Sequence, residues 1–158
     1  MFDTIQGLPV HALVVHAVVV LVPLSAVGVL AIAAVPRWRE RFGTLVLLVS
    51  TGALVTVPVA TRSGQDLKER VGASGVVARQ IDDHQEIGEL VLWPTLGMEV
   101  LAIALVALSR RRAAKGAVTA VAVLAAVAAV AAAGLVLRAG HLGSTAVWSC
   151  TVGSDACK

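Results

Sequence analysis

The sequence predicts an all-α membrane protein, folded as a bundle of four transmembrane helices. Its 158 residues are 58% hydrophobic and only 15% charged, with a mean hydropathy of +0.87, which is far more apolar than an ordinary soluble domain. Four long apolar stretches alternate with short charged segments. Only helices satisfy their own backbone hydrogen bonds in lipid outside a closed barrel, so we expect one membrane domain over residues 1–158.

The first apolar stretch, residues 8–35, organises the prediction. It contains no charged residue and exceeds the roughly 20 residues that cross a bilayer. Pro9 suits the first turn of a helix, whereas Pro23 is expected to kink it. The stretch is too long for a signal-peptide core and lacks a basic segment before it. We therefore expect a retained membrane span.

Three further spans are expected at about 43–61, 83–108 and 117–138. The second is rich in β-branched residues, but a lone strand cannot satisfy its backbone in lipid, so a helix is expected. The fourth is mostly Ala and Val, and such small side chains let helices approach closely. Residues 62–82 form the polar loop between the second and third spans, and residues 139–158 form a polar tail.

Charge distribution predicts the orientation of this bundle. The short segments 36–42 and 109–116 hold seven of the 13 Lys and Arg residues and one of the ten acids. The positive-inside rule makes them cytoplasmic, which places both termini, the 62–82 loop and the tail outside the plasma (inner) membrane. The basic residues form no patch interleaved with aromatic residues, which argues against nucleic acid as a partner.

This topology brings all four histidines to the outer side. Odd-numbered spans begin there and even-numbered spans end there, so His11 and His16, His84, and His141 share one end of the bundle. Asp66, just after the second span, adds a carboxylate. The sequence thus predicts an outward-facing cluster of metal-ligating groups from remote segments.

Two chemistries fit such a cluster. The first is b-type haem, which needs two axial imidazoles from facing helices, and His16 with His84 or His141 is the expected pair. In the haem interpretation Gly88 leaves space for the ring. The other candidate cofactor-binding residues are His11, Arg62 and Arg138, the arginines pairing either with propionates or with lipid headgroups. The second chemistry is a Zn²⁺ or Cu²⁺ ion. Its candidate ligands are His11, His16, His84, His141 and Asp66.

Glu99 lies about 22 Å along the third span from His84, at 1.5 Å per residue. Helical periodicity puts a stripe of residues on one face of this span, and that face is expected to point into the bundle. The stripe consists of His84, Gly88, Val91, Thr95 and Glu99. An ionisable group at this depth is a functional hypothesis by default. Two interpretations stay open: a proton path toward the histidines, or a protonated Glu hydrogen-bonded to Ser50, Thr51 or a nearby carbonyl.

Cys150 and Cys157 lie in the tail. Outside the membrane they are expected to form a disulfide that closes a short loop, worth about 2.5 kcal/mol in the chain-entropy picture.

Several short motifs together resemble a known family. His11-Ala-Leu-Val-Val-His16 opens the first span, Ser63-Gly64-Gln65-Asp66 follows the second, His84 opens the third, and Gly140-His141-Leu142-Gly143 ends the fourth. This pattern resembles the DUF2231 family of bacterial four-helix membrane proteins, which has no assigned activity. The chain departs from the family pattern at Ala12, where Pro is usual, and in its tail. Fusion of some relatives to Rieske-type domains implies membrane redox work.

The leading functional hypothesis is electron transfer by a haem held at the outer histidines, between a membrane donor and an outer-face redox partner. One alternative is a cofactor-free accessory or scaffold subunit of a larger membrane complex, or of a homo-oligomer. Another is an outward Zn- or Cu-binding membrane protein. No nucleophile–base pair or phosphate-binding loop points to an enzyme with its own substrate, and enzymatic activity is left open.

Overall fold

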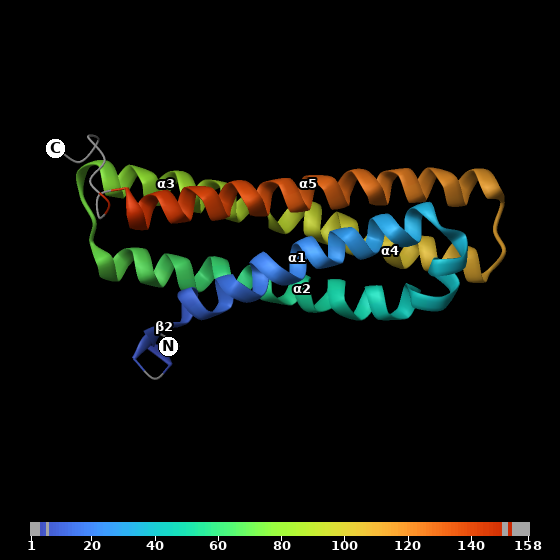
Figure 1. Cartoon of the computed structure of the whole chain (residues 1–158), viewed down its shortest axis with the longest axis horizontal. Coiled ribbons are helices and arrows are strands. Elements are labelled where there is room, and N and C mark those ends of the chain that lie inside the picture. Colours follow the sequence, from blue (N-terminus) through green and yellow to red (C-terminus); the bar gives the residue numbers. More distant parts are fainter. Residues whose placement is uncertain (1–3, 6, 150–151, 153–158) are drawn as a thin grey trace.

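The computed structural model describes residues 4–5, 7–149 and 152. After a short hairpin, β1 Thr4–Ile5 and β2 Leu8–Pro9, these residues form five helices. These are α1 Val10–Ala34, α2 Pro36–Val71, α3 Gly75–Leu90, α4 Leu92–Arg110 and α5 Lys115–Trp148 (Figure 1). Because α3 and α4 form one continuous rod, four segments of the described chain are long and apolar enough to cross a membrane. The predicted four-span helical bundle is confirmed.

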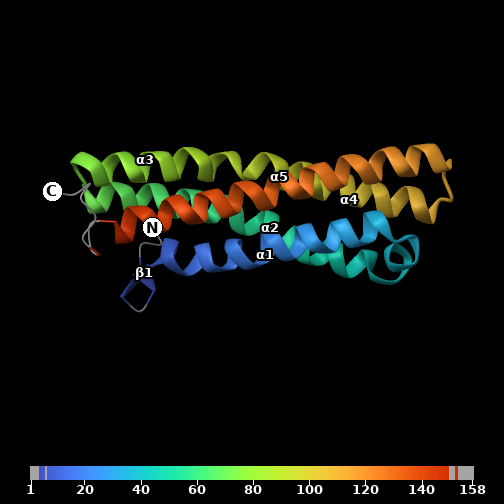
Figure 2. The same ribbon diagram turned by 45° about the horizontal axis from the view of Figure 1, so that its top comes forward.

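The helices run along one elongated bundle with two distinct ends (Figures 1 and 2). One end carries the start of α1, the α2–α3 connection and the end of α5, and we call it the histidine end. The other carries the α1–α2 and α4–α5 connections, and we call it the arginine end. In the core, α1 packs against α2 and α5, and α4 packs against the same two helices.

The helices extend well beyond the predicted spans. α2 continues to Val71 and α3 begins at Gly75, so the predicted 62–82 loop is only three residues long. Residues 36–42 form the first turns of α2, and residues 139–148 of the predicted tail belong to α5. Hydropathy marks where a helix leaves lipid, whereas the helix itself ends where its backbone bonding ends. The sequence interpretation confused these two boundaries.

Specific residues set the helix ends and the break. Pro36, in the first turn of α2, has no N–H to leave unsatisfied. Gly72 ends α2 in the left-handed conformation, with φ of 55°, that Gly adopts without strain. Pro94 cannot donate to the Leu90 carbonyl, and there α3 gives way to α4. Val91 at this break bonds instead to the Gly88 carbonyl, 3.3 Å away.

The two halves of the bundle repeat one burial pattern. Adding 73 to the number of each buried residue of α1 from Val18 to Ile32 gives a buried residue at the end of α3 or in α4. The matched pairs are Val18 and Val91, Val22 and Thr95, Ser25 and Met98, Ala26 and Glu99, Val29 and Ala102, and Ile32 and Leu105.

The second helices of the two halves match in the same way, at an offset of 79. The pairs are Ser50 and Ala129, Ala53 and Ala132, Val57 and Val136, and Ala60 and Ala139. Both halves begin at the histidine end, so an approximate two-fold axis runs along the bundle.

Candidate functional site

The structure brings two of the four histidines together on this axis. His11 at the start of α1 and His84 in α3 are equivalent positions of the two halves, and their ring centroids lie 6.1 Å apart. The ring planes are nearly perpendicular, at 77°. Both side chains are half-buried. The two imidazoles therefore form a symmetric pair at the histidine end.

Each imidazole is fixed by a carbonyl of the neighbouring helix. His11 Nδ1 lies 3.0 Å from the Ala60 carbonyl oxygen, and His84 Nδ1 lies 2.8 Å from that of Ala139. A carbonyl only accepts, so both Nδ1 atoms carry the proton and donate it. In a neutral ring the lone pair is then on Nε2. Among the described residues neither Nε2 has a hydrogen-bond partner, which leaves both free to bind a metal.

A glycine packs against each ring, one turn after the accepting carbonyl. A Cβ added at Gly64 would lie 3.0 Å from His11 Cε1, and one at Gly143 would lie 3.0 Å from His84 Cε1. The corresponding Nδ1 atoms would be 3.1 Å away, whereas the Nε2 atoms would be 3.7 and 3.6 Å away. The glycines thus allow close contact on the Nδ1–Cε1 edge. The sequence motifs contain both residues, but the sequence interpretation gave them no role.

The other two histidines do not join this pair. His16 is exposed on α1, and its Nδ1 contacts the Ala12 carbonyl of the same helix. His141 is exposed on α5. The five-residue rotation between His11 and His16 puts them on different faces of α1. This arrangement therefore favours the pairing of His11 with His84, and not the expected axial pairing of His16 with His84 or His141.

The remaining predicted ligands are dispersed. Asp66, Arg62 and Arg138 are exposed, and Gly88 is half-buried with open space beside it. Within residues 4–5, 7–149 and 152, no three His, Cys, Asp or Glu side chains come close enough to hold a metal ion together. Four histidines and Asp66 do not form one ligand set. Cys150 and Cys157 lie outside the described residues.

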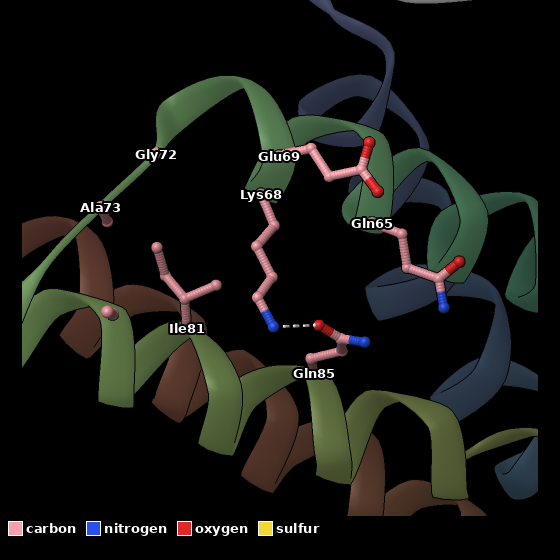
Figure 3. A pocket seen from close by; sticks show the side chains of 8 residues that line it. Gln65, Lys68, Glu69, Gly72, Ala73, Ile81 and Gln85 are labelled. Carbon is pink, nitrogen blue, oxygen red and sulfur yellow. Dashed lines mark hydrogen bonds between the residues drawn. The ribbon is translucent and has the colours of Figure 1, made fainter.

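A pocket of about 450 Å³ lies between α2 and α3 (Figure 3). Two of its lining residues, Gln65 and Gln85, directly follow Gly64 and His84 in the sequence. Lys68 reaches across it, donating to Gln85 Oε1 at 2.9 Å and pairing with Asp82 at 2.6 Å. Its lining residues are Gln65, Lys68, Glu69, Gly72, Ala73, Ala78, Ile81 and Gln85. Polar and apolar residues both line the pocket, and the sequence interpretation missed it because it treated this region as a loop.

Glu99 lies deep in the bundle, 5% exposed, on the interface of α4 with α2. The Thr51 hydroxyl is 2.7 Å from its Oε1, and the Ser50 hydroxyl contacts its Oε2. The expected hydrogen bonds of Glu99 to Ser50 and Thr51 are confirmed, as is the inward direction of the stripe, because Val91, Thr95 and Glu99 are all buried. The proton path stays a prediction.

Arg39 is a buried residue at the arginine end that the sequence interpretation treated only as a topology signal. Its guanidinium donates to the carbonyls of Ile32 at 2.8 Å and Ala33 at 2.9 Å, and to Ser109 Oγ at 3.0 Å. These carbonyls belong to the last turn of α1, where no further N–H of the helix is present to bond to them. An Arg shortly after a helix end is the signal that could have identified this role.

These features define a class of protein: a four-span integral membrane bundle built from two similar helix pairs, with a histidine pair between them. The chain belongs to the DUF2231 family, described as "Predicted membrane protein (DUF2231)", whose model matches residues 7–156. This match confirms the resemblance found in the sequence motifs. No curated protein and no solved structure matches the chain.

Proposed function

We propose that this protein binds a metal-centred redox cofactor, a b-type haem, between Nε2 of His11 and Nε2 of His84, and transfers electrons in the membrane. The single observation that carries the proposal is the paired arrangement in which both imidazoles donate Nδ1–H to a carbonyl and keep Nε2 free. Metal-bound histidines have this arrangement, because the second bond fixes the tautomer and the ring.

The separation of the rings fits a shared metal. Two imidazoles bound through Nε2 to one ion, at about 2.0–2.1 Å each, put their centroids about 5 Å apart at a tetrahedral angle and about 6.4 Å apart when they lie on opposite sides of the ion. The observed separation is 6.1 Å. His11 and His84 would hold the iron, and Gly64 and Gly143 would keep each ring against its carbonyl. The haem, when bound, supplies a one-electron couple, and the partial burial of both histidines reduces its contact with water.

The number of ligands favours haem over a bare ion. A haem iron needs only one or two protein ligands, since the porphyrin occupies its other positions. Structural zinc takes four protein ligands and catalytic zinc three. The described part of the chain offers two at this position. A Zn²⁺ or Cu²⁺ centre would need ligands from a second chain or from small molecules.

Absorbance spectra of the purified protein test this proposal. Bound haem gives a Soret band when oxidised and a sharpened α band when reduced. His11→Ala and His84→Ala are expected to abolish these bands, whereas His16→Ala and His141→Ala, at exposed positions, should retain them. If the wild-type spectrum is flat, elemental analysis decides between a bare metal and a cofactor-free scaffold. Haem retained in both His11 and His84 variants would refute the ligand assignment.

We further propose that the arginine end faces the cytoplasm and the histidine end the outside of the plasma membrane, where a redox partner would dock. The charge asymmetry between the two ends supports this orientation. Single cysteines introduced at Ala73 and Ala113 in a cysteine-free background test it, because these positions lie in the connections at opposite ends. An impermeant thiol reagent applied to intact cells should label position 73 and not position 113. The reverse pattern would invert the topology.

A further inference from the structure

The interface between α2 and α4 holds a second polar centre, remote from the histidines. Glu99 and Ser50 are buried there, and the hydroxyl of the exposed Thr51 bonds to the same carboxyl group. It is about 16 Å along the helix from Arg110 and about 22 Å from His84, at 1.5 Å per residue. The carboxyl group therefore lies within the membrane-spanning part of the bundle.

The surroundings of Glu99 contain no compensating cation. Residues 43–61 of α2 and 116–137 of α5 include no charged or titratable residue, and α4 has no other until Arg110. In α1 the only titratable groups are His11 and His16, at the histidine end. A carboxylate buried without a positive partner costs several kcal/mol, and a buried group usually avoids this cost by binding a proton.

The hydrogen-bond pattern suits a protonated carboxyl group. Ser50 Oγ and Thr51 Oγ1 each also lie near the Leu47 carbonyl, at 3.2 and 2.8 Å. Each hydroxyl has one proton to donate. If the acid O–H of Glu99 donates to Ser50, the Ser50 hydroxyl can donate to Leu47 while Thr51 donates to Glu99. With Glu99 ionised, only the two hydroxyl protons would serve these four contacts, whereas a protonated Glu99 supplies a third proton.

Comparison of the two halves shows that packing does not require this polar centre. The position equivalent to Glu99 is Ala26, and the position equivalent to Ser50 is Ala129. Both alanines are buried in one apolar cluster with Ala125. The same helix–helix interface is thus built with alanines in one half and with a carboxyl group and hydroxyls in the other. A helix–helix interface of this kind thus closes without a carboxyl group in the other half, which points to a role for Glu99 beyond packing.

We infer that Glu99, Ser50 and Thr51 form a proton-binding site inside the membrane, in which the Glu99 carboxyl group binds an exchangeable proton. The site is single, because its counterpart in the other half is apolar. It is independent of any cofactor at His11 and His84.

Infrared difference spectroscopy of the protein in lipid tests this inference. The carbonyl stretch of a protonated carboxylic acid lies well above the bands of a carboxylate, so subtracting Glu99→Gln from wild type isolates the Glu99 signal. The expected difference at pH 7 is one acid band, which shifts in D₂O and moves when Ser50→Ala or Thr51→Val removes a hydroxyl partner. Glu89→Gln, at an exposed position on α3, should give carboxylate bands as the matched control.

Carboxylate bands from Glu99 at pH 7 would overturn the inference. An acid band that ignores D₂O would also overturn it, because the proton would then not exchange. Neither result depends on cofactor content, so the outcome is distinct from that of the haem test.

Discussion

Replacing Gly64 or Gly143 with Ala is expected to destabilise the bundle by forcing each histidine away from its carbonyl. In an ordinary helix interior, Gly→Ala stabilises by about 0.5–1 kcal/mol. Here the new methyl would lie 3.0 Å from Cε1 of the ring, closer than ordinary van der Waals contact. Overpacking of this kind costs about 1–3 kcal/mol. The two effects oppose each other, so a matched control is needed.

Each helix provides its own control. Gly52 on α2 and Gly140 on α5 have no atom within 4 Å of an added Cβ. The difference in unfolding free energy between Gly64→Ala and Gly52→Ala, and between Gly143→Ala and Gly140→Ala, should be about 1–3 kcal/mol. Denaturant unfolding in detergent micelles measures it. In a His11→Ala background, the Gly64→Ala penalty should vanish. Equal stability of the variants and their controls would refute the contact between glycine and imidazole.

Three further predictions concern other parts of the bundle. Arg39→Ala should lower the unfolding free energy by at least about 2 kcal/mol, because it removes charge-assisted hydrogen bonds to two carbonyls. The control Arg37→Ala, at an exposed position, should change it by less than about 0.5 kcal/mol in the same denaturant titration. Ala26→Glu should lower the unfolding free energy by more than about 3 kcal/mol, because an apolar cluster surrounds this position, and it should reduce the yield of folded protein in gel filtration. A stable variant would contradict the asymmetry between the halves. Lys68→Ala should cost less than about 1 kcal/mol, and less still at high salt, because its pair with Asp82 is largely exposed; thermal unfolding at two salt concentrations checks this.

The sequence predicts the span count well because lipid leaves few alternatives. A charge-free run such as 8–35 in a bilayer has to be a helix, and the alternation of spans orders the histidines without any packing information. Helix ends were predicted poorly, since polar segments such as 62–71 continue a helix after it leaves the apolar region. Hydropathy does not report that continuation.

The candidate site was predicted only in part, for a geometric reason. Topology fixes the end of the bundle at which a side chain lies but not the direction in which it points. His16 was therefore expected to be the axial ligand of the first span, although it is His11 that lies against His84. Gly64 and Gly143 carry no chemistry of their own, and their role depends on the ring that packs against them. The stripe ending at Glu99 was predicted correctly because helical periodicity alone determines it.

The length of α2 has a consequence for how the histidine pair meets other molecules. Its 36 residues span about 54 Å, whereas the hydrocarbon layer is about 30 Å thick. Gly64, which packs against His11, lies about 10 Å before the end of α2, so the histidine pair lies well short of the end of the bundle. If the protein transfers electrons as proposed, a soluble carrier would have to reach the pair from the side of α2, whereas a carrier that moves within the lipid would meet it nearer the apolar part of the bundle.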